Sequence, residues 1–149
     1  MFERSVEELG ILDTLHELEI GFVAYSPLGR GFISGDIKSP DDFPADDFRR
    51  SLPRFQTPQF EKNIQLVNEI KKMAEEKQIT PSQLALSWIV SKNILPIPGT
   101  KRVKYVEENI EAAQMTLTTE EINRLEKIIP LGTETGMRYD EANMAFVNQ

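Results

Sequence analysis

The sequence predicts an α/β fold built from parallel βα units. Two short apolar runs, residues 22–25 and 94–97, have the length of buried strands, and segments with helical periodicity lie before, between and after them. Strands that alternate with helices indicate a parallel sheet. Two strands are too few for a stable parallel sheet, because such strands need neighbours or covering helices on both sides. The pattern therefore looks like an excerpt from a larger α/β domain.

Composition narrows the classes of function. The chain has 149 residues, enough for one domain with a sizeable core, and no cysteine, which excludes disulfides and cysteine-ligated metals. Its formal net charge of −7 argues against generic nucleic-acid or anionic-membrane binding, although a local basic patch remains compatible with it. No secretory signal and no apolar run of roughly 20 residues is found, so we expect a cytoplasmic protein with no membrane partner.

The first half of the chain begins with a predicted helix over residues 4–19. Leucine and valine recur there at three-residue spacing, at Val6, Leu9, Leu12, Leu15 and Leu18. The strand 22–25 follows, and it ends at the loop signature of residues 26–31. Residues 36–58 are rich in proline and aspartate, and a connection of this length is often a lid.

The second half opens with two predicted helices. The first covers about residues 60–77. The second begins at Thr80-Pro81-Ser82-Gln83, where Thr80 can cap the helix and Gln83 can complete a capping box. This second helix is apolar nearly all round, so we expect it to be buried, with Trp88 in the core.

A second strand and two further helices complete the pattern. Pro96 and Pro98 have no backbone N–H to donate, so we do not expect residues 94–97 to form an ordinary ladder strand. The loop 99–102 leads into predicted helices over about residues 103–113 and 119–129. We expect the tail, residues 131–149, to be irregular.

Two loops are candidate phosphate sites. The glycines of residues 29–35 have the wrong spacing for a dinucleotide fingerprint, but their small size would let backbone amides approach a phosphate; a plain turn is an equal alternative. Residues 99–102 lie between a strand and a helix, where free amides and the helix dipole join the charges of Lys101 and Arg102. The alternative for this second loop is a basic surface turn.

Other chemistry finds little support. His16 is the only histidine and has no convergent partners, so we interpret it as a solvated side chain. Glu107 and Glu108 are adjacent in a predicted helix and point in different directions, so they are not a carboxylate pair. No metal-ligand spacing is present.

Three segments, in order, resemble the aldo/keto reductase family. Residues 24–31, AYSPLGRG, are similar to the loop after the family's strand seven, and PIPGTKR at 96–102 with Glu107-Glu108-Asn109 is similar to its strand eight and following helix. The helix between them, TPSQLALSW at 80–88, and the tail residues 138–141 also fit. The resemblance covers essentially the whole chain, and it is greatest to bacterial and plant reductases with a Pro-Gly-Thr version of the second loop.

The resemblance implies the C-terminal portion of a (β/α)8 TIM barrel, about the last two βα units with the preceding helix, from a fold that needs about 250 residues. It implies an oxidoreductase that reduces aldehydes and ketones with NADP(H). Residues 25–31 would line the pyrophosphate and the nicotinamide ribose, Arg49 would close over the cofactor, and residues 99–102 would hold the 2′-phosphate. The full cofactor-binding set is Tyr25, Ser26, Pro27, Leu28, Gly29, Gly31, Arg49, Gly99, Thr100, Lys101, Arg102, Tyr105, Glu108 and Asn109.

The same resemblance assigns no catalytic residue to this chain. The family's catalytic Asp, Tyr, Lys and His all lie before the matched region, and none of Tyr25, Tyr105 and Tyr139 matches the catalytic tyrosine. The chain is then expected to be a partial reductase domain, inactive alone, whose partners are a small carbonyl substrate and either the missing N-terminal half or a second copy. Two alternatives stay open: a non-catalytic NADP-binding or regulatory module, and an interaction protein that fills its core by self-association.

Overall fold

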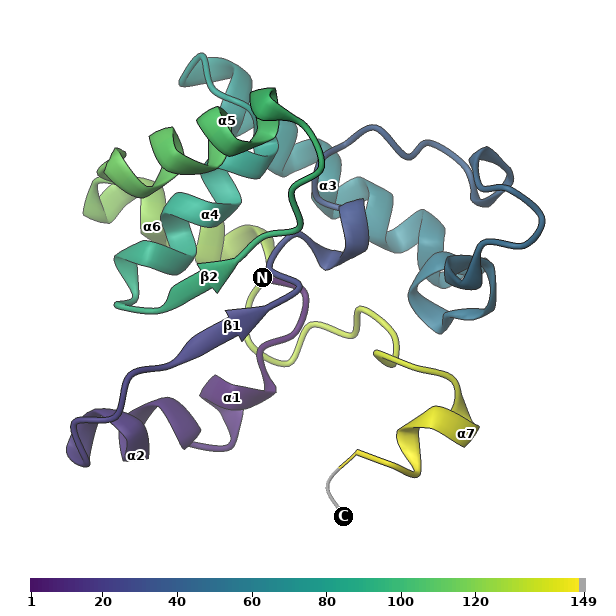
Figure 1. Cartoon of the computed structure of the whole chain (residues 1–149), viewed down its shortest axis with the longest axis horizontal. Helices are drawn as coiled ribbons and strands as arrows, with labels where there is room; N and C mark the ends of the chain where they lie inside the picture. The colour runs from purple at the N-terminus through teal and green to yellow at the C-terminus, as the bar shows by residue number, and fades with distance from the viewer. Residues whose placement is uncertain (148–149) are drawn as a thin grey trace.

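The computed structural model describes residues 1–147 as a two-stranded parallel sheet with helices packed beside it (Figure 1). The elements, in chain order, are α1 (Ser5–Glu8), α2 (Ile11–Glu17), β1 (Val23–Tyr25), the 3-10 turns η1 (Gly29–Gly31), η2 (Pro40–Asp42), η3 (Phe48–Ser51) and η4 (Pro53–Phe55), then α3 (Gln59–Glu76), α4 (Pro81–Ser91), β2 (Leu95–Ile97), α5 (Val103–Gln114), α6 (Thr119–Ile128) and α7 (Glu141–Met144).

The two predicted strands are confirmed, and they pair directly with each other. β1 and β2 are parallel, with Tyr25 opposite Ile97. The prolines were predicted to demote β2 from an ordinary ladder strand, and β2 is an edge strand that still pairs with β1. Leu95 N–H donates to the Phe22 carbonyl over 3.0 Å, and successive residues of a strand direct their N–H groups to opposite edges. The nitrogen of Pro96 therefore faces the open edge, where no donor is needed.

The single helix predicted over residues 4–19 is wrong, because the chain breaks it into α1 and α2. Gly10 lies between them with φ of +67°, a left-handed conformation that glycine adopts at little cost. The leucine stripe does not pack as one face either, since Leu9 and Leu18 are exposed. The helical spacing of the leucines therefore did not predict one continuous helix, because these side chains do not pack together against the core.

Helices α3 and α4 match their predictions closely, and the cap of α4 is formed as expected. Thr80 Oγ1 accepts a hydrogen bond from Gln83 N–H over 3.1 Å, and Gln83 Oε1 accepts one from Thr80 N–H over 3.0 Å. Residues 83–89 of α4 are all buried, and Trp88 is only 4% exposed. The helix is thus the centre of the core, as its all-round apolar sequence predicted.

Aromatic side chains from the long connection complete the core. The Phe32 ring lies 5.1 Å from that of Phe55 and 5.2 Å from that of Phe60, and Phe43 packs on Phe55 from the other side. Residues 36–58 are therefore a packed segment of the domain, held by buried phenylalanines and by Leu52.

A partly buried group of ion pairs fixes the N-terminal segment to α4 and α6. Arg4 pairs with Glu7 and Glu126, and Lys92 bridges the same two carboxylates over 2.7 Å each. Trp88 Nε1 donates to Glu126 over 3.2 Å, and Arg4 and Lys92 both lie near the indole ring. Opposite charges meet around one aromatic side chain, so no charge of this group is left without a counter-ion.

The last helices are found where the sequence placed them, but the tail is less irregular than expected. α5 and α6 match their predictions, and Thr118 caps α6 with a second capping box. The tail carries the short helix α7, which begins because Asp140 Oδ1 accepts from Asn143 N–H over 2.9 Å. Residues 148–149, part of the predicted tail, lie outside the described residues. No helix within residues 1–147 has the length and apolar character to cross a membrane.

Candidate functional site

The two candidate phosphate loops lie at the same edge of the sheet. Because β1 and β2 are parallel, their carboxyl ends, at Tyr25 and Ile97, lie at the same edge of the sheet (Figure 1). In open α/β sheets this edge is where ligands bind. Residues 26–31 follow β1, and residues 98–102 follow β2 and lead into α5. The structure therefore brings together two loops that are separated by about 70 residues in sequence.

The first loop is a tight turn in a left-handed conformation. Ser26, Gly29, Arg30 and Gly31 have φ of +51°, +58°, +59° and +90°. Two of these residues are not glycine, and L-residues rarely adopt such angles unless the surroundings fix them. The amides of Gly29 and Gly31 donate within the turn, to Ser26 and Leu28 carbonyls over 3.0 and 3.1 Å. These two glycines therefore shape the turn with their amides already bonded, so the proposed amide approach to a phosphate does not rest on them.

Arg49 lies against this turn, and its guanidinium is engaged by neighbours in the chain. Its Nη1 donates to the Arg30 carbonyl over 3.1 Å, and its Nη2 pairs with Asp47 at 2.6 Å. The hydrogen bonds from Arg49 lower the pKa of Asp47 to about 2, and the same contact raises the pKa of Arg49. Arg49 thus braces the turn, and closure over a cofactor stays a prediction.

Tyr25 closes β1 and contacts the tail of the chain. Its hydroxyl accepts a hydrogen bond from Arg138 Nη1 over 2.7 Å. Burial and a hydrogen bond with Tyr139 raise the pKa of Tyr25, and that hydrogen bond, helped by the charges of Arg30 and Arg138, lowers the pKa of Tyr139. In the sequence, Arg138 and Tyr139 are identified only by their similarity to the family. No local pattern shows that they reach a strand 113 residues away.

The second loop presents its polar groups to solvent. Gly99, Thr100, Lys101 and Arg102 are all exposed, and within residues 1–147 neither cationic side chain forms an ion pair. α5 begins at Val103 with no side-chain cap and no acidic residue in its first turn. Uncapped amides and two cations without an ion-pair partner at a helix N-terminus are features that favour anion binding, and the phosphate site stays a prediction.

The predicted adenine-side residues are found on α5 behind this loop. Asn109 Nδ2 donates to Thr100 Oγ1 over 3.0 Å, and Thr100 Oγ1 donates to the Pro98 carbonyl over 3.2 Å. Glu108 is half-buried and pairs with Lys104 at 3.5 Å. Tyr105 is 38% exposed on the same helix. The structure therefore gathers the second loop and its helix into one surface, with Asn109 ordering Thr100.

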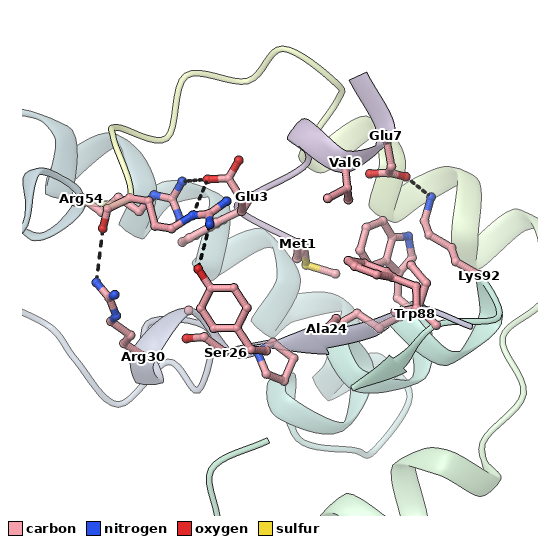
Figure 2. Close-up of a pocket in the computed structure, with 18 of the residues that line it drawn as sticks. Met1, Glu3, Val6, Glu7, Ala24, Ser26, Arg30, Arg54, Trp88 and Lys92 are labelled. Atoms are coloured by element: carbon pink, nitrogen blue, oxygen red, sulfur yellow. Dashed lines mark hydrogen bonds and ion pairs between the residues drawn. The ribbon is translucent and has the colours of Figure 1, made fainter. Parts of the chain in front are cut away.

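A pocket of about 140 Å³ opens beside the first loop (Figure 2). Met1, Val6, Ala24 and Trp88 form its apolar walls. Its polar rim carries the Glu3–Arg54 ion pair at 2.7 Å and the Glu7–Lys92 pair described above. These four charged side chains have counter-ions, whereas Arg30, which also lines the pocket, forms no ion pair within residues 1–147. Among residues 1–147, no group of three His, Asp or Glu side chains is arranged to hold a metal ion.

The structure is thus two parallel βα units of an α/β protein, with one glycine-rich loop and one basic loop at their carboxyl edge. The sequence profile of the aldo/keto reductase family matches residues 1–130, and the chain belongs to this family. The recognised family is confirmed; the bacterial and plant branch stays a prediction.

Relatives of known name support the same conclusion. The chain is 46% identical over 134 residues to aldo-keto reductase yakc [NADP(+)] of Schizosaccharomyces pombe, covering 89% of this chain and 39% of the relative. It is 45% identical over 123 residues to aldo-keto reductase str7 of Strobilurus tenacellus, covering 81% of this chain and 37% of the relative. The chain therefore spans well under half the length of these relatives.

Two solved structures confirm the α/β fold of an aldo/keto reductase barrel. The glycerol dehydrogenase AKR11B4 from Gluconobacter oxydans superposes with a TM-score of 0.77 at 29% identity, over 85% of this chain and 39% of that one. The thermostable aldo-keto reductase Tm1743 superposes with a TM-score of 0.59 at 23% identity, over 85% and 36%, and shows the fold alone.

Proposed function

We propose that this chain supplies the NADP(H)-binding part of an aldo/keto reductase, an oxidoreductase that converts aldehydes and ketones to alcohols. The observation that carries the proposal is the uncompensated pair Lys101 and Arg102 at the uncapped N-terminus of α5. A 2′-phosphate distinguishes NADP(H) from NAD(H), and charge-assisted hydrogen bonds to it are the strongest contacts that such a loop offers. The NADP(+) in the name of the Schizosaccharomyces pombe relative supports the same cofactor.

We assign each part of this dinucleotide to a group of residues at the carboxyl edge of the sheet. We place the adenosine 2′-phosphate at residues 99–102, the adenine beside Tyr105, Glu108 and Asn109, and the pyrophosphate and nicotinamide ribose along residues 25–31. When bound, the dinucleotide supplies the hydride. This chain's residues bind it and fix the distance between its two ends through the β1–β2 register.

We further propose that the chain corresponds to the last two βα units of the barrel and that catalysis requires groups from the rest of it. General acid catalysis needs a proton donor within reach of the substrate oxygen, and no residue of this chain matches the family's catalytic tetrad. The 149-residue chain alone should not oxidise NADPH with a carbonyl substrate. Steady turnover that is abolished by a mutation within the chain would contradict this.

An apolar surface supports the proposal that a partner completes the barrel. Val23, Tyr25, Leu95 and Ile97 lie on one face of the sheet and are each more than half exposed, and both strands have an open edge. Val103, Val106 and Ile110 are further exposed apolar side chains on α5. Each such side chain gains roughly 1–2 kcal/mol on full burial, so the set is comparable with the roughly 5–15 kcal/mol stability of a domain.

The partner that we propose is the N-terminal portion of an aldo/keto reductase, since its strands would pair with both open edges. Co-expression with the N-terminal portion of the Schizosaccharomyces pombe relative should convert an aggregated or self-associated chain into a 1:1 complex with a cooperative melt, measured by sedimentation and calorimetry. A compact 149-residue monomer with one sharp melt would contradict it. A complex that binds NADPH without reducing any carbonyl would favour the non-catalytic module.

A further inference from the structure

Three side chains tie the tail of the chain to the turn after β1. Arg30 leaves the turn and its guanidinium lies between two rings, 4.7 Å from the centre of Tyr139 and 5.2 Å from that of Phe48. Its Nη1 also donates to the Arg138 carbonyl over 3.2 Å. Arg30 therefore connects the turn, the long connection and the tail in one contact.

Arg138 makes the reciprocal connection from the tail. Its Nη1 donates to Tyr25 Oη over 2.7 Å, and its Nε lies 3.5 Å from Glu3. The tail is held in place just before this point, where Arg54 Nε donates to the Gly136 carbonyl over 2.9 Å and the buried Asn63 donates to the Thr135 carbonyl over 2.9 Å. The tail is thus anchored on α3 and reaches the carboxyl end of β1 in a fixed position.

The turn itself needs such support. Ser26 and Arg30 hold left-handed backbone angles that persist only when neighbouring groups fix them. Arg49 secures one side of the turn through the Arg30 carbonyl. The other side is secured by Arg138 and Tyr139, since Tyr25 immediately precedes Ser26.

We propose that Arg30, Arg138 and Tyr139 form a tail clamp that positions residues 25–31 for the pyrophosphate end of the dinucleotide. The clamp rests on the proposed function, and its members act through the turn as positioning residues. A clamp on the first loop should leave the second loop unaffected, because Lys101 and Arg102 form no side-chain hydrogen bond or ion pair with the tail within the described residues, and the bonds of Arg138 go to Tyr25, Arg30 and Glu3.

Because the clamp should act on the first loop alone, it can be tested with two ligands that differ in the loops they engage. NADPH engages both loops, whereas 2′,5′-ADP carries the 2′-phosphate and adenine but lacks the pyrophosphate link and the nicotinamide half. Arg138→Met, made in the chain within the 1:1 complex described above, should weaken NADPH binding about tenfold, the equivalent of about one lost hydrogen bond, and leave 2′,5′-ADP affinity unchanged. Hydrogen exchange should accelerate at residues 26–31 and not in α3 or α4.

The matched control is Arg124→Met, which removes an exposed arginine paired with Glu76 over 2.8 Å on the far helices. It should change neither affinity. Tyr139→Phe, which keeps the ring over Arg30 and removes only the hydroxyl, should give a smaller loss than Tyr139→Leu, and it serves where Arg138→Met fails to fold.

The outcomes separate the two proposals. If the unmutated chain in the folded 1:1 complex binds neither NADPH nor 2′,5′-ADP, the proposed function fails. If it binds both and the clamp variants bind NADPH as tightly as before, the clamp alone is overturned. An equal loss for both ligands, with faster exchange throughout the chain, would show a general structural role and would also overturn the clamp.

Discussion

Lys101 and Arg102 should decide whether the chain prefers NADPH over NADH, and changing both to alanine should remove that preference. Both side chains are exposed beside the uncapped start of α5, where a 2′-phosphate would meet two cations and the helix dipole. NADH lacks this phosphate and should lose little when the cations are removed. The change in the ratio of the two affinities therefore isolates the contribution of the loop.

The size of the effect follows from the exposure of the two side chains. A hydrogen bond between charged groups contributes about 1.5–3 kcal/mol when shielded, but exposed ion pairs contribute closer to 1 kcal/mol. Two such contacts give about 2 kcal/mol, or about a thirtyfold loss of NADPH affinity, because each 1.4 kcal/mol is tenfold. The loss should shrink as salt is added, since the Debye length falls to about 3 Å at 1 M.

Titration of NADPH and NADH, followed by the fluorescence of the reduced nicotinamide, measures both dissociation constants. Lys104→Ala is the matched control, because Lys104 lies on the same helix but pairs with Glu108 at 3.5 Å and should leave the preference intact. Equal affinity of the unmutated chain for the two cofactors would refute the assignment of the 2′-phosphate to this loop. A preference that survives the double substitution would refute it as well.

Three further predictions concern stability. Thr80→Ala should lower the free energy of unfolding by about 1 kcal/mol because the α4 cap is lost, whereas Thr80→Ser should not, as thermal melts would show. Gly136 has φ of +83° and an added Cβ would lie 2.9 Å from a side chain of α3, so Gly136→Ala should destabilise more than Gly132→Ala, where φ is +76° and the space is open; equal melting temperatures would contradict this. Burial alone would raise the pKa of Glu7 and Glu126, but hydrogen bonds with Lys92 and Arg4 lower both values below 4.5. Their stabilisation should be complete above about pH 4.5 and lost as the pH falls through the lowered folded values, and a double Gln variant should flatten this acid limb of a denaturation series.

Local patterns were sufficient where a structural feature depends on neighbours in sequence. The capping box at Thr80, the all-round apolar helix α4 and the two apolar strands were predicted from a few adjacent residues each. The break at Gly10 was missed because the leucine spacing is helical on both sides of it, and only the left-handed glycine interrupts the pattern. The start of α7 could have been predicted from the sequence. Asp140 is a favoured N-cap residue, and its side chain accepts a hydrogen bond from the amide of Asn143, three residues later.

In the candidate site too, the features that depend on neighbours in sequence were predicted, and those that depend on distant residues were not. Each phosphate loop follows directly from its strand, so residues 26–31 and 99–102 were predicted as loops from short motifs. The contacts of Arg138 with Tyr25 and of Arg30 with the tail join residues 113 and 108 positions apart in sequence. Contacts over such separations cannot be predicted from the local spacing of residue types. The exposed state of Lys101 and Arg102 also depends on what the rest of the chain leaves uncovered.

Cofactor binding and hydride transfer place different demands on the fold. Each proposed cofactor loop is part of one βα unit, and the pairing of Tyr25 with Ile97 sets the separation of the two loops, so under the proposed function a chain with both strands in register would carry both halves of the binding surface. Under the same proposal, the proton donor would be held over the nicotinamide by another part of the barrel. Within residues 1–147, no further strand lies on either side of β1 and β2 to support their register. Binding should therefore survive separation from the rest of the fold only as far as the packing of α4 against β2 and the tail clamp across β1 keep that register. On this argument, affinity for the dinucleotide reports the integrity of a two-stranded sheet.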